Sequence, residues 1–165
     1  MIRSTLFVCT VFMAASGFAS AQATVRVEPA NLQSPRPLPE QTQAAAIRDY
    51  LKSWQSLRAA LEQNRSDLLD PDFVGTAREK LAETIQQQAA LGIRTRYQDS
   101  AHDIQIVFYS PEGLSIELTD SVEYDVQIIN HDRVNPIQHI SARYVIVITP
   151  AEVRWRVRVF QVALK

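Results

Sequence analysis

The spacing of apolar residues changes at Gly92, and this change constrains the fold more than any other feature of the chain. Between residues 42 and 64 apolar side chains recur three or four positions apart, which is the spacing of one helical face. After Gly92 apolar and polar residues alternate, which predicts strands with one buried face. A helix with a single apolar stripe must cover a surface, and a half-buried sheet provides one, so we expect an α+β domain. The stripe consists of Ile47, Tyr50, Leu51, Trp54, Leu57 and Leu61.

Two shorter helices are predicted between the long helix and the strands. Ser66 and Asp70-Pro71 are typical helix starts, because proline suits the first helical position. The third helix is expected to begin with a capping box, in which Thr76 and Glu79 bond each other's free backbone N–H groups. Gly92 suits the left-handed residue that ends this helix.

Four strands are predicted over residues 102–109, 114–129, 140–149 and 153–162. The connections between them are short, so we expect a four-stranded antiparallel sheet whose one face is covered by the helices. A short edge strand over residues 24–27 can be added to it. On the second strand the helix-facing set comprises Ile116, Leu118, Val122, Tyr124, Val126 and Ile128.

The last two strands are expected to turn at Pro150-Ala151, which places Trp155 opposite Ile146 on the helix-facing side. The outer face then carries Arg143, Arg154, Arg156 and Arg158, with Glu117, Glu123 and Asp125 on the neighbouring strand. Ordinary cross-strand pairing explains this arrangement better than binding of a polyanion. Apolar side chains on the same outer face need a cover, either the lead-in segment or, as we expect, a second copy of the chain. These interface candidates are Val145, Val147, Phe160 and Val162.

Residues 1–21 are typical of a signal peptide. Arg3 precedes an apolar run of about ten residues, and Ala19-Ser20-Ala21 predicts cleavage after Ala21. The run is too short to span a bilayer, which takes about 20 residues. The single cysteine, Cys9, lies in the removed segment, so the mature chain has no disulfide. We therefore expect a secreted or periplasmic protein with no membrane attachment after cleavage.

The mature chain divides into a lead-in over residues 22–40, which holds four prolines, and one domain over residues 41–165. The net charge of −1 for the whole chain gives no electrostatic case for binding nucleic acid or an anionic membrane.

The order of these parts resembles the nuclear transport factor 2-like superfamily, which includes SnoaL-like proteins and cystatin-like cones. The likeness rests on the long helix with Trp54-Gln55-Ser56-Leu57, the helix closed by Gly92, and the last strand from Val153 to Phe160. It covers residues 42–165 and is architectural. It implies helices packed on the concave face of a curved sheet, with a pocket at the mouth of the cone. The superfamily holds ketosteroid isomerase-like and polyketide cyclase-like enzymes, dehydratases, secretion assembly factors and binding modules. Its enzymes tend to carry an Asp or a His/Asp pair in the cone, and no position of this chain matches that pattern from sequence.

Residues that could carry chemistry have ordinary explanations as well. The candidates for lining a pocket are Tyr50, Trp54, Tyr124, Tyr144 and Trp155, although inward aromatic residues more often form a core. His102 and Asp103 could tune a general base, but adjacent strand residues point to opposite faces. His131, Asp132 and His139 could hold zinc but lack the short fixed spacing of a metal motif. We expect no metal and no cofactor.

The sequence therefore favours an exported, non-catalytic binding or assembly module. Its cone-shaped pocket would take an apolar small molecule or a peptide, and its outer sheet face would form a homodimer. One alternative is a small isomerase, lyase or hydrolase of the ketosteroid isomerase-like or polyketide cyclase-like kind. Another is a scaffold component of a cell-envelope complex.

Overall fold

The computed structural model describes residues 22–32, 36–131 and 133–163. This part of the chain forms two α-helices, one 3₁₀ helix and six strands. In chain order they are β1 (Thr24–Val27), α1 (Glu40–Gln63), η1 (Ser66–Leu69), α2 (Gly75–Ala90), β2 (Ile93–Tyr109), β3 (Ile116–Asn130), β4 (Arg133–Val134), β5 (Gln138–Ala151) and β6 (Arg154–Val162). The predicted signal peptide, residues 1–21, lies outside the described residues.

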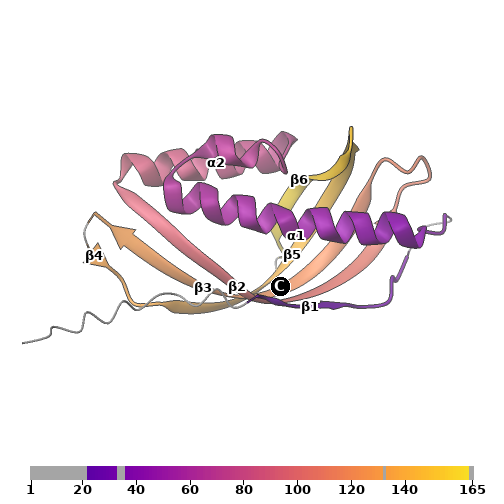
Figure 1. Cartoon of the computed structure of the whole chain (residues 1–165), viewed down its shortest axis with the longest axis horizontal. Coiled ribbons are helices and arrows are strands. Elements are labelled where there is room, and N and C mark those ends of the chain that lie inside the picture. The colour runs from indigo at the N-terminus through magenta and orange to yellow at the C-terminus, as the bar shows by residue number, and fades with distance from the viewer. Residues whose placement is uncertain (1–21, 33–35, 132, 164–165) are drawn as a thin grey trace, which may run out of the picture.

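The strands form one curved sheet in the order β1-β2-β3-β5-β6, and β4 pairs with β3. Neighbouring strands are antiparallel except β1 and β2, which are parallel. Helix α1 lies across the concave face, and α2 lies on the same side of the sheet (Figure 1). The predicted α+β class is therefore confirmed. The expected count of four strands was wrong, because β1 and β4 extend a sheet that is mixed rather than purely antiparallel.

The apolar stripe of α1 packs on the sheet as its spacing predicts. Tyr50, Trp54 and Leu57 are buried in the core between helix and sheet. The helix ends at Asn64, which takes the left-handed conformation at φ 54° and donates from its side chain to the carbonyl of Ile93 at 2.8 Å. Asn64 thus ends α1 and also holds the start of β2.

Helix α2 does not begin with the predicted capping box. It begins at Gly75 after the extended residue Val74, and no side chain caps its first turn. Thr76 instead donates from its hydroxyl to the carbonyl of Arg158 at 3.1 Å, so contact with β6 takes the group that capping would need. Gly92 follows the helix at φ 67°, the left-handed conformation predicted for it.

The register of the last hairpin differs from the expected one. Ala151 pairs with Arg154, so the turn is Glu152-Val153, and Pro150 lies within β5 opposite Trp155. A bulge between Val147 and Ile148 then shifts the pairing again. The sequence prediction failed because it treated Pro150 as a turn residue, although a strand position that needs no backbone N–H tolerates proline.

This register moves two of the four interface candidates to the helix-facing side. Phe160 pairs with the buried Ile146, and Val162 pairs with the buried Tyr144, so their predicted outward orientation was wrong. Val145 and Val147 alternate with buried residues of β5 and lie on the outer face, half-buried. The homodimer stays a prediction, and Phe160 no longer supports it.

The arginines of the last strand also have partners other than those expected. Arg154 pairs with Asp72 at 3.3 Å, and Arg156 donates to backbone carbonyls of the turn at residues 70–71. Arg143 donates to the hydroxyl of Thr119 at 3.4 Å. The connection after η1 therefore supplies the partners of Arg154 and Arg156, where the sequence predicted carboxylates of β3.

The lead-in segment is part of the fold. Its strand β1 pairs in parallel with Ala101–Ile104 of β2, which confirms the edge strand expected over residues 24–27. Leu32 and Leu38 pack against the hydrophobic core. Arg36 donates to the carbonyl of Pro111 at 2.6 Å. The described part of this segment, residues 22–32 and 36–39, thus acts as an arm that closes the outer edge of β2.

Candidate functional site

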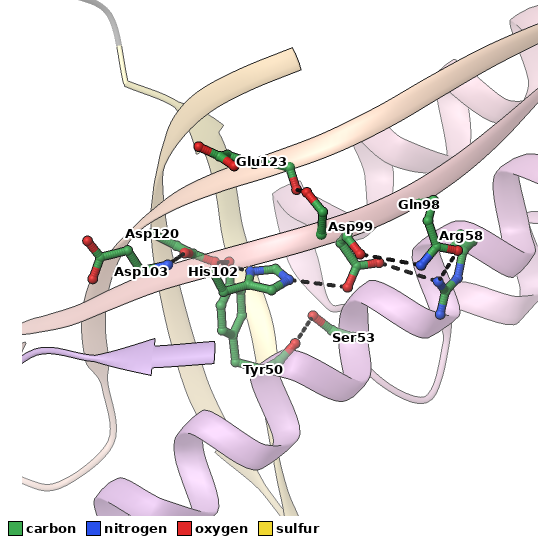
Figure 2. Close-up of polar contacts among 10 residues, drawn as sticks. Tyr50, Ser53, Arg58, Gln98, Asp99, His102, Asp103, Asp120 and Glu123 are labelled. Carbon is green, nitrogen blue, oxygen red and sulfur yellow. Dashed lines mark hydrogen bonds and ion pairs between the residues drawn. The ribbon is translucent and has the colours of Figure 1, made fainter. Parts of the chain in front are cut away.

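A buried histidine lies between two carboxylates on the helix-facing side of the sheet. His102 on β2 places its Nδ1 2.7 Å from Oδ2 of Asp120 on β3, and its Nε2 3.3 Å from Oδ2 of Asp99. His102 is 2% exposed and Asp120 is 0% exposed. Figure 2 shows the imidazole between these two carboxylates, whereas Asp103 and Glu123 point away from it.

Asp120 connects the histidine to the long helix. The hydroxyl of Tyr50 on α1 donates to Oδ2 of Asp120 at 2.7 Å (Figure 2). The backbone N–H of Asp103 donates to Oδ1 of Asp120 at 3.1 Å. Both carboxylate oxygens therefore have protein donors, and the contacts join α1 to β2 and β3.

A β-bulge brings Asp99 to the same histidine. In a regular strand, residues three positions apart point to opposite faces. The register between β2 and β3 shifts between Asp99 and Ala101, so the extra residue reverses the alternation. Asp99 consequently faces α1 together with His102, and its Oδ1 lies 3.4 Å from the guanidinium of Arg58 on that helix.

The two carboxylates hold His102 in its cationic form. Burial by itself lowers the pKa of His102, but the hydrogen bonds to Asp120 and Asp99, with the charges of both, outweigh it and raise the pKa to about 9. The hydrogen bond from His102 is the largest cause of a lowered pKa for the Asp99 carboxyl. Burial, and then the charge of Asp120, raise the pKa of Tyr50 well above its usual value. At neutral pH the cationic His102 therefore lies between the carboxyl groups of Asp120 and Asp99, and Arg58 lies beside Asp99.

The chemistry that this cluster can perform is limited because both ring nitrogens of His102 are hydrogen-bonded within the chain. A protonated imidazole donates from both nitrogens, and here both donate to carboxylates of the protein. General base catalysis needs an unprotonated nitrogen within reach of a substrate proton. His102 offers none while both contacts persist. Through Tyr50 and Arg58 the cluster links α1 to β2 and β3.

Three of the five predicted pocket-lining residues, Trp54, Tyr124 and Tyr144, pack against one another. The ring of Trp54 lies 5.5 Å from Tyr144 and 6.4 Å from Tyr124, measured between centroids, and the hydroxyls of Tyr124 and Tyr144 are 3.0 Å apart. Tyr97 stacks on Tyr124 at 4.3 Å, and Phe160 stacks on Tyr144 at 4.8 Å. These rings form an aromatic core at the place where the sequence analysis expected a pocket wall.

Trp155 lies apart from this aromatic core, near the β5–β6 turn. It is half-buried and packs against the hydrophobic core, and its backbone N–H donates to Oδ2 of Asp49 on α1 at 2.9 Å. Its helix-facing orientation agrees with the sequence prediction, although its cross-strand partner does not.

A cavity of about 430 Å³ lies at this end of the molecule. Its walls are Pro71, from the connection after η1, and the β5–β6 turn with the start of β6. The turn residue Glu152 has φ 47°, and the next residue, Val153, is 85% exposed. The lining residues from the hairpin are Ala151, Glu152, Val153, Arg154 and Arg156.

The histidines considered for zinc lie elsewhere and have other partners. His139 contacts Asp125 at 3.0 Å, and His131 contacts the side chain of Asn130 at 2.7 Å. Asp132 lies outside the described residues. Among residues 22–32, 36–131 and 133–163, no three His, Cys, Asp or Glu side chains are grouped as a metal site requires.

Asp120 and Asp99 were not predicted from the sequence as partners of His102. Asp120 has a readable signal, because it lies between Leu118 and Val122 with the parity of the buried residues. A charged residue on a buried face needs a partner of opposite charge. The inward position of Asp99 has no comparable sequence signal. It depends on a bulge, and the alternation of apolar and polar residues does not show where the bulge lies.

No protein-family model matches the chain, and no curated protein matches its sequence. Solved structures do match its fold. The intermembrane space region of the chloroplast protein ARC6 aligns with a TM-score of 0.64 at 10% identity, over 79% of this chain and 100% of that region.

Two proposed dehydratases also align over most of their length. A proposed scytalone dehydratase from Novosphingobium aromaticivorans has a TM-score of 0.51 at 11% identity, over 76% of this chain and 89% of its own. A proposed dehydratase of the NTF2-like family from Streptomyces avermitilis has a TM-score of 0.50 at 10% identity, over 72% of this chain and 96% of its own.

In the described part of the chain, no helix has the length and apolar composition to cross a membrane. At these identities the comparisons establish the fold, and the chain has the nuclear transport factor 2-like cone that its order of helices and strands indicates.

Proposed function

We propose that this chain is an exported binding or assembly module of the cell envelope that carries out no chemistry of its own. The observation that carries the proposal is that the buried cluster around His102 has its hydrogen bonds satisfied within the chain. His102 is 2% exposed, and each of its ring nitrogens contacts a carboxylate of the same chain. The cluster therefore has no reactive group directed at a substrate.

The place where a partner can enter is the cavity beside the β5–β6 turn. Three of the aromatic residues that the sequence assigned to a cone-shaped pocket, Trp54, Tyr124 and Tyr144, contact each other. The cavity of about 430 Å³ instead combines an exposed valine with two arginines, and its size falls in the range of binding pockets. Between the two ligands considered from the sequence, a peptide segment of a partner protein suits this surface better than an apolar small molecule.

The location outside the cytoplasm rests on the predicted signal peptide. The likeness to ARC6 supports it, because the aligned part of that protein is named as a region of the chloroplast intermembrane space. An envelope location agrees with either a stand-alone module or a scaffold component of a larger complex. A second copy of the chain, docked on the outer face at Val145 and Val147, is one of the partners that this proposal covers.

Site-specific photo-crosslinking in the cells that produce the protein tests the proposal. A benzophenone amino acid at Val153 is expected to give one discrete crosslinked protein, identified by mass spectrometry. The matched control is the same amino acid at Leu114, another exposed apolar residue, which lies in a different turn. Equal adduct patterns at both positions, or no adduct at Val153, would contradict a binding surface at the cavity.

The enzyme alternative has one observation in its favour, the buried His102–Asp120 pair within the cone. An active site must admit its substrate, so the ring N–H protons of His102 would then exchange freely with water. In the closed cluster, both ring N–H signals should be visible by nuclear magnetic resonance at neutral pH, because burial slows exchange. Rapid exchange of these protons would favour the enzyme alternative.

A further inference from the structure

Two arginines line the cavity, and both are held in place by the protein. Arg156 donates to the carbonyl of Pro71 at 3.1 Å and to the carbonyl of Asp70. Arg154 contacts Oδ1 of Asp72 at 3.3 Å. Asp72 is itself buried and accepts a hydrogen bond from Ser56 at 2.5 Å. The guanidinium groups are therefore fixed before any ligand arrives, which reduces the entropy lost on binding.

These contacts leave donors free for a ligand. A guanidinium has five N–H donors. In the described part of the chain, Arg154 uses one nitrogen and Arg156 uses two in the contacts above. The remaining donors of each planar group suit the two oxygens of a carboxylate.

The rest of the cavity is suited to an apolar side chain. Val153 is 85% exposed at the tip of the turn, and Pro71 forms the facing wall. Glu152 takes φ 47°, a conformation that residues other than glycine adopt at a cost of about 1–3 kcal/mol. This strained turn holds Val153 outward beside the arginines.

We infer, on the basis of the proposed function, that the cavity binds an acidic segment of a partner protein. A carboxylate of that segment contacts Arg154 and Arg156, and a neighbouring apolar side chain packs on Val153 and Pro71. The apolar wall favours a peptide over a lipid headgroup or a free phosphate, which would use the arginines alone. Glu152 is the carboxylate in the cavity lining, and it limits affinity for an anionic ligand.

Binding of a model peptide to the complete mature chain tests this inference. The probe is a fluorescent hexapeptide of alternating Asp and Val, and its partner is the same peptide with Asn in place of Asp. Fluorescence polarisation should show the Asp peptide binding about tenfold more tightly, as expected for charge-assisted hydrogen bonds. Arg156→Gln should remove most of this difference, whereas Glu152→Gln should strengthen binding of the Asp peptide several-fold.

Arg94→Gln is the matched control, because Arg94 is an exposed arginine of β2 outside the cavity lining. It should change the affinity less than about twofold. Arg156→Lys keeps the charge and loses the planar fork, so it should bind with intermediate affinity. If Arg156→Gln fails to fold, the Glu152→Gln variant still decides the outcome, since it leaves both arginines in place.

Three results would overturn the inference. They are equal binding of the Asp and Asn peptides, an effect of Arg94→Gln as large as that of Arg156→Gln, and Arg156-dependent binding of phosphatidylglycerol vesicles or inorganic phosphate without binding of the Asp peptide. If a discrete crosslink at Val153 accompanies any of these results, the proposed binding surface is retained and only the acidic nature of the partner is rejected. Loss of both the crosslink and the peptide binding rejects the two proposals together.

Discussion

Asp120 is the residue that joins the parts of the buried cluster. It accepts from Tyr50, His102 and the backbone of Asp103, and it is fully buried. Asp120→Asn removes one member of a buried charge pair and leaves the cationic His102 without its nearer partner. The free energy of unfolding should fall by about 3–5 kcal/mol, measured by urea denaturation.

Asp125→Asn is the control for this change. Asp125 also contacts a histidine, His139, at 3.0 Å, but the pair is solvent-exposed. Its removal should cost less than about 1 kcal/mol. Equal effects of the two substitutions would show that burial of the cluster does not contribute to stability.

The raised pKa of His102 predicts how stability depends on pH. The pKa is about 9 in the folded chain against an ordinary value of 6.5. Below pH 6.5 both states hold the proton, and the contribution of His102 is complete. Between pH 6.5 and 9 the unfolded chain releases the proton first, so the free energy of unfolding falls, by at most about 3 kcal/mol.

Urea denaturation of the wild-type chain and of His102→Gln at several pH values between 6 and 10 measures this effect. The stability of the wild-type chain should decline more steeply than that of the variant, and the difference isolates the histidine from other titrating groups. Parallel curves would mean that His102 is neutral in the folded chain at pH 7.

At the scale of residues, half of the cluster was within reach of sequence reasoning. Asp120 lies between the buried Leu118 and Val122, and His102 lies two residues before the buried Ile104. Two opposite charges on one buried face predict a pair. The inward position of Asp99 depends on the bulge before Ala101, and the alternation of side chains alone does not reveal where an extra residue is accommodated.

At the scale of elements, the aromatic core makes a prediction about the last strand. Phe160 lies 5.3 Å from Trp54 and 4.8 Å from Tyr144, measured between ring centroids. Phe160→Glu should therefore lower the free energy of unfolding by more than about 3 kcal/mol, because it removes an aromatic contact and buries a charge. Thermal denaturation followed by circular dichroism measures the loss.

Val153→Glu in the exposed turn is the control and should stay within about 0.5 kcal/mol of the wild-type value. A folded, stable Phe160→Glu domain that only loses self-association would restore the outward orientation first expected for Phe160.

Helices and strands differ in how well the sequence specified them. The stripe from Ile47 to Leu61 and the stop at Gly92 were enough to place α1 and the end of α2, because helical spacing is local. Strand pairing is not local. The β5–β6 register depends on Pro150 lying inside a strand and on a bulge at Val147, and both features become favourable only when the core is packed.

At the scale of the whole molecule, the lead-in arm closes one edge of the sheet. Deletion of residues 22–31 removes β1 and leaves Ala101–Ile104 of β2 without a neighbour on that side. Unpaired strand edges associate with other chains. The shortened chain should melt at a lower temperature and form oligomers, measured by light scattering.

Deletion of residues 22 and 23 alone is the control, because it keeps β1 intact. A shortened chain that stays monodisperse with an unchanged melting temperature would show that the arm is dispensable for the fold.

The opposite edge of the sheet is closed by the chain itself. Val157 of β6 donates to the carbonyl of Asp72 at 2.8 Å and accepts from the backbone N–H of Val74 at 2.9 Å, and Phe73 bridges to it in parallel. The backbone groups of Val157 are therefore not available to pair with a strand of another protein. The proposed acidic partner therefore cannot bind by adding a strand at Val157, and its recognition depends on its side chains. A loop, a helix or an extended tail that presents a carboxylate to the cavity should bind equally well.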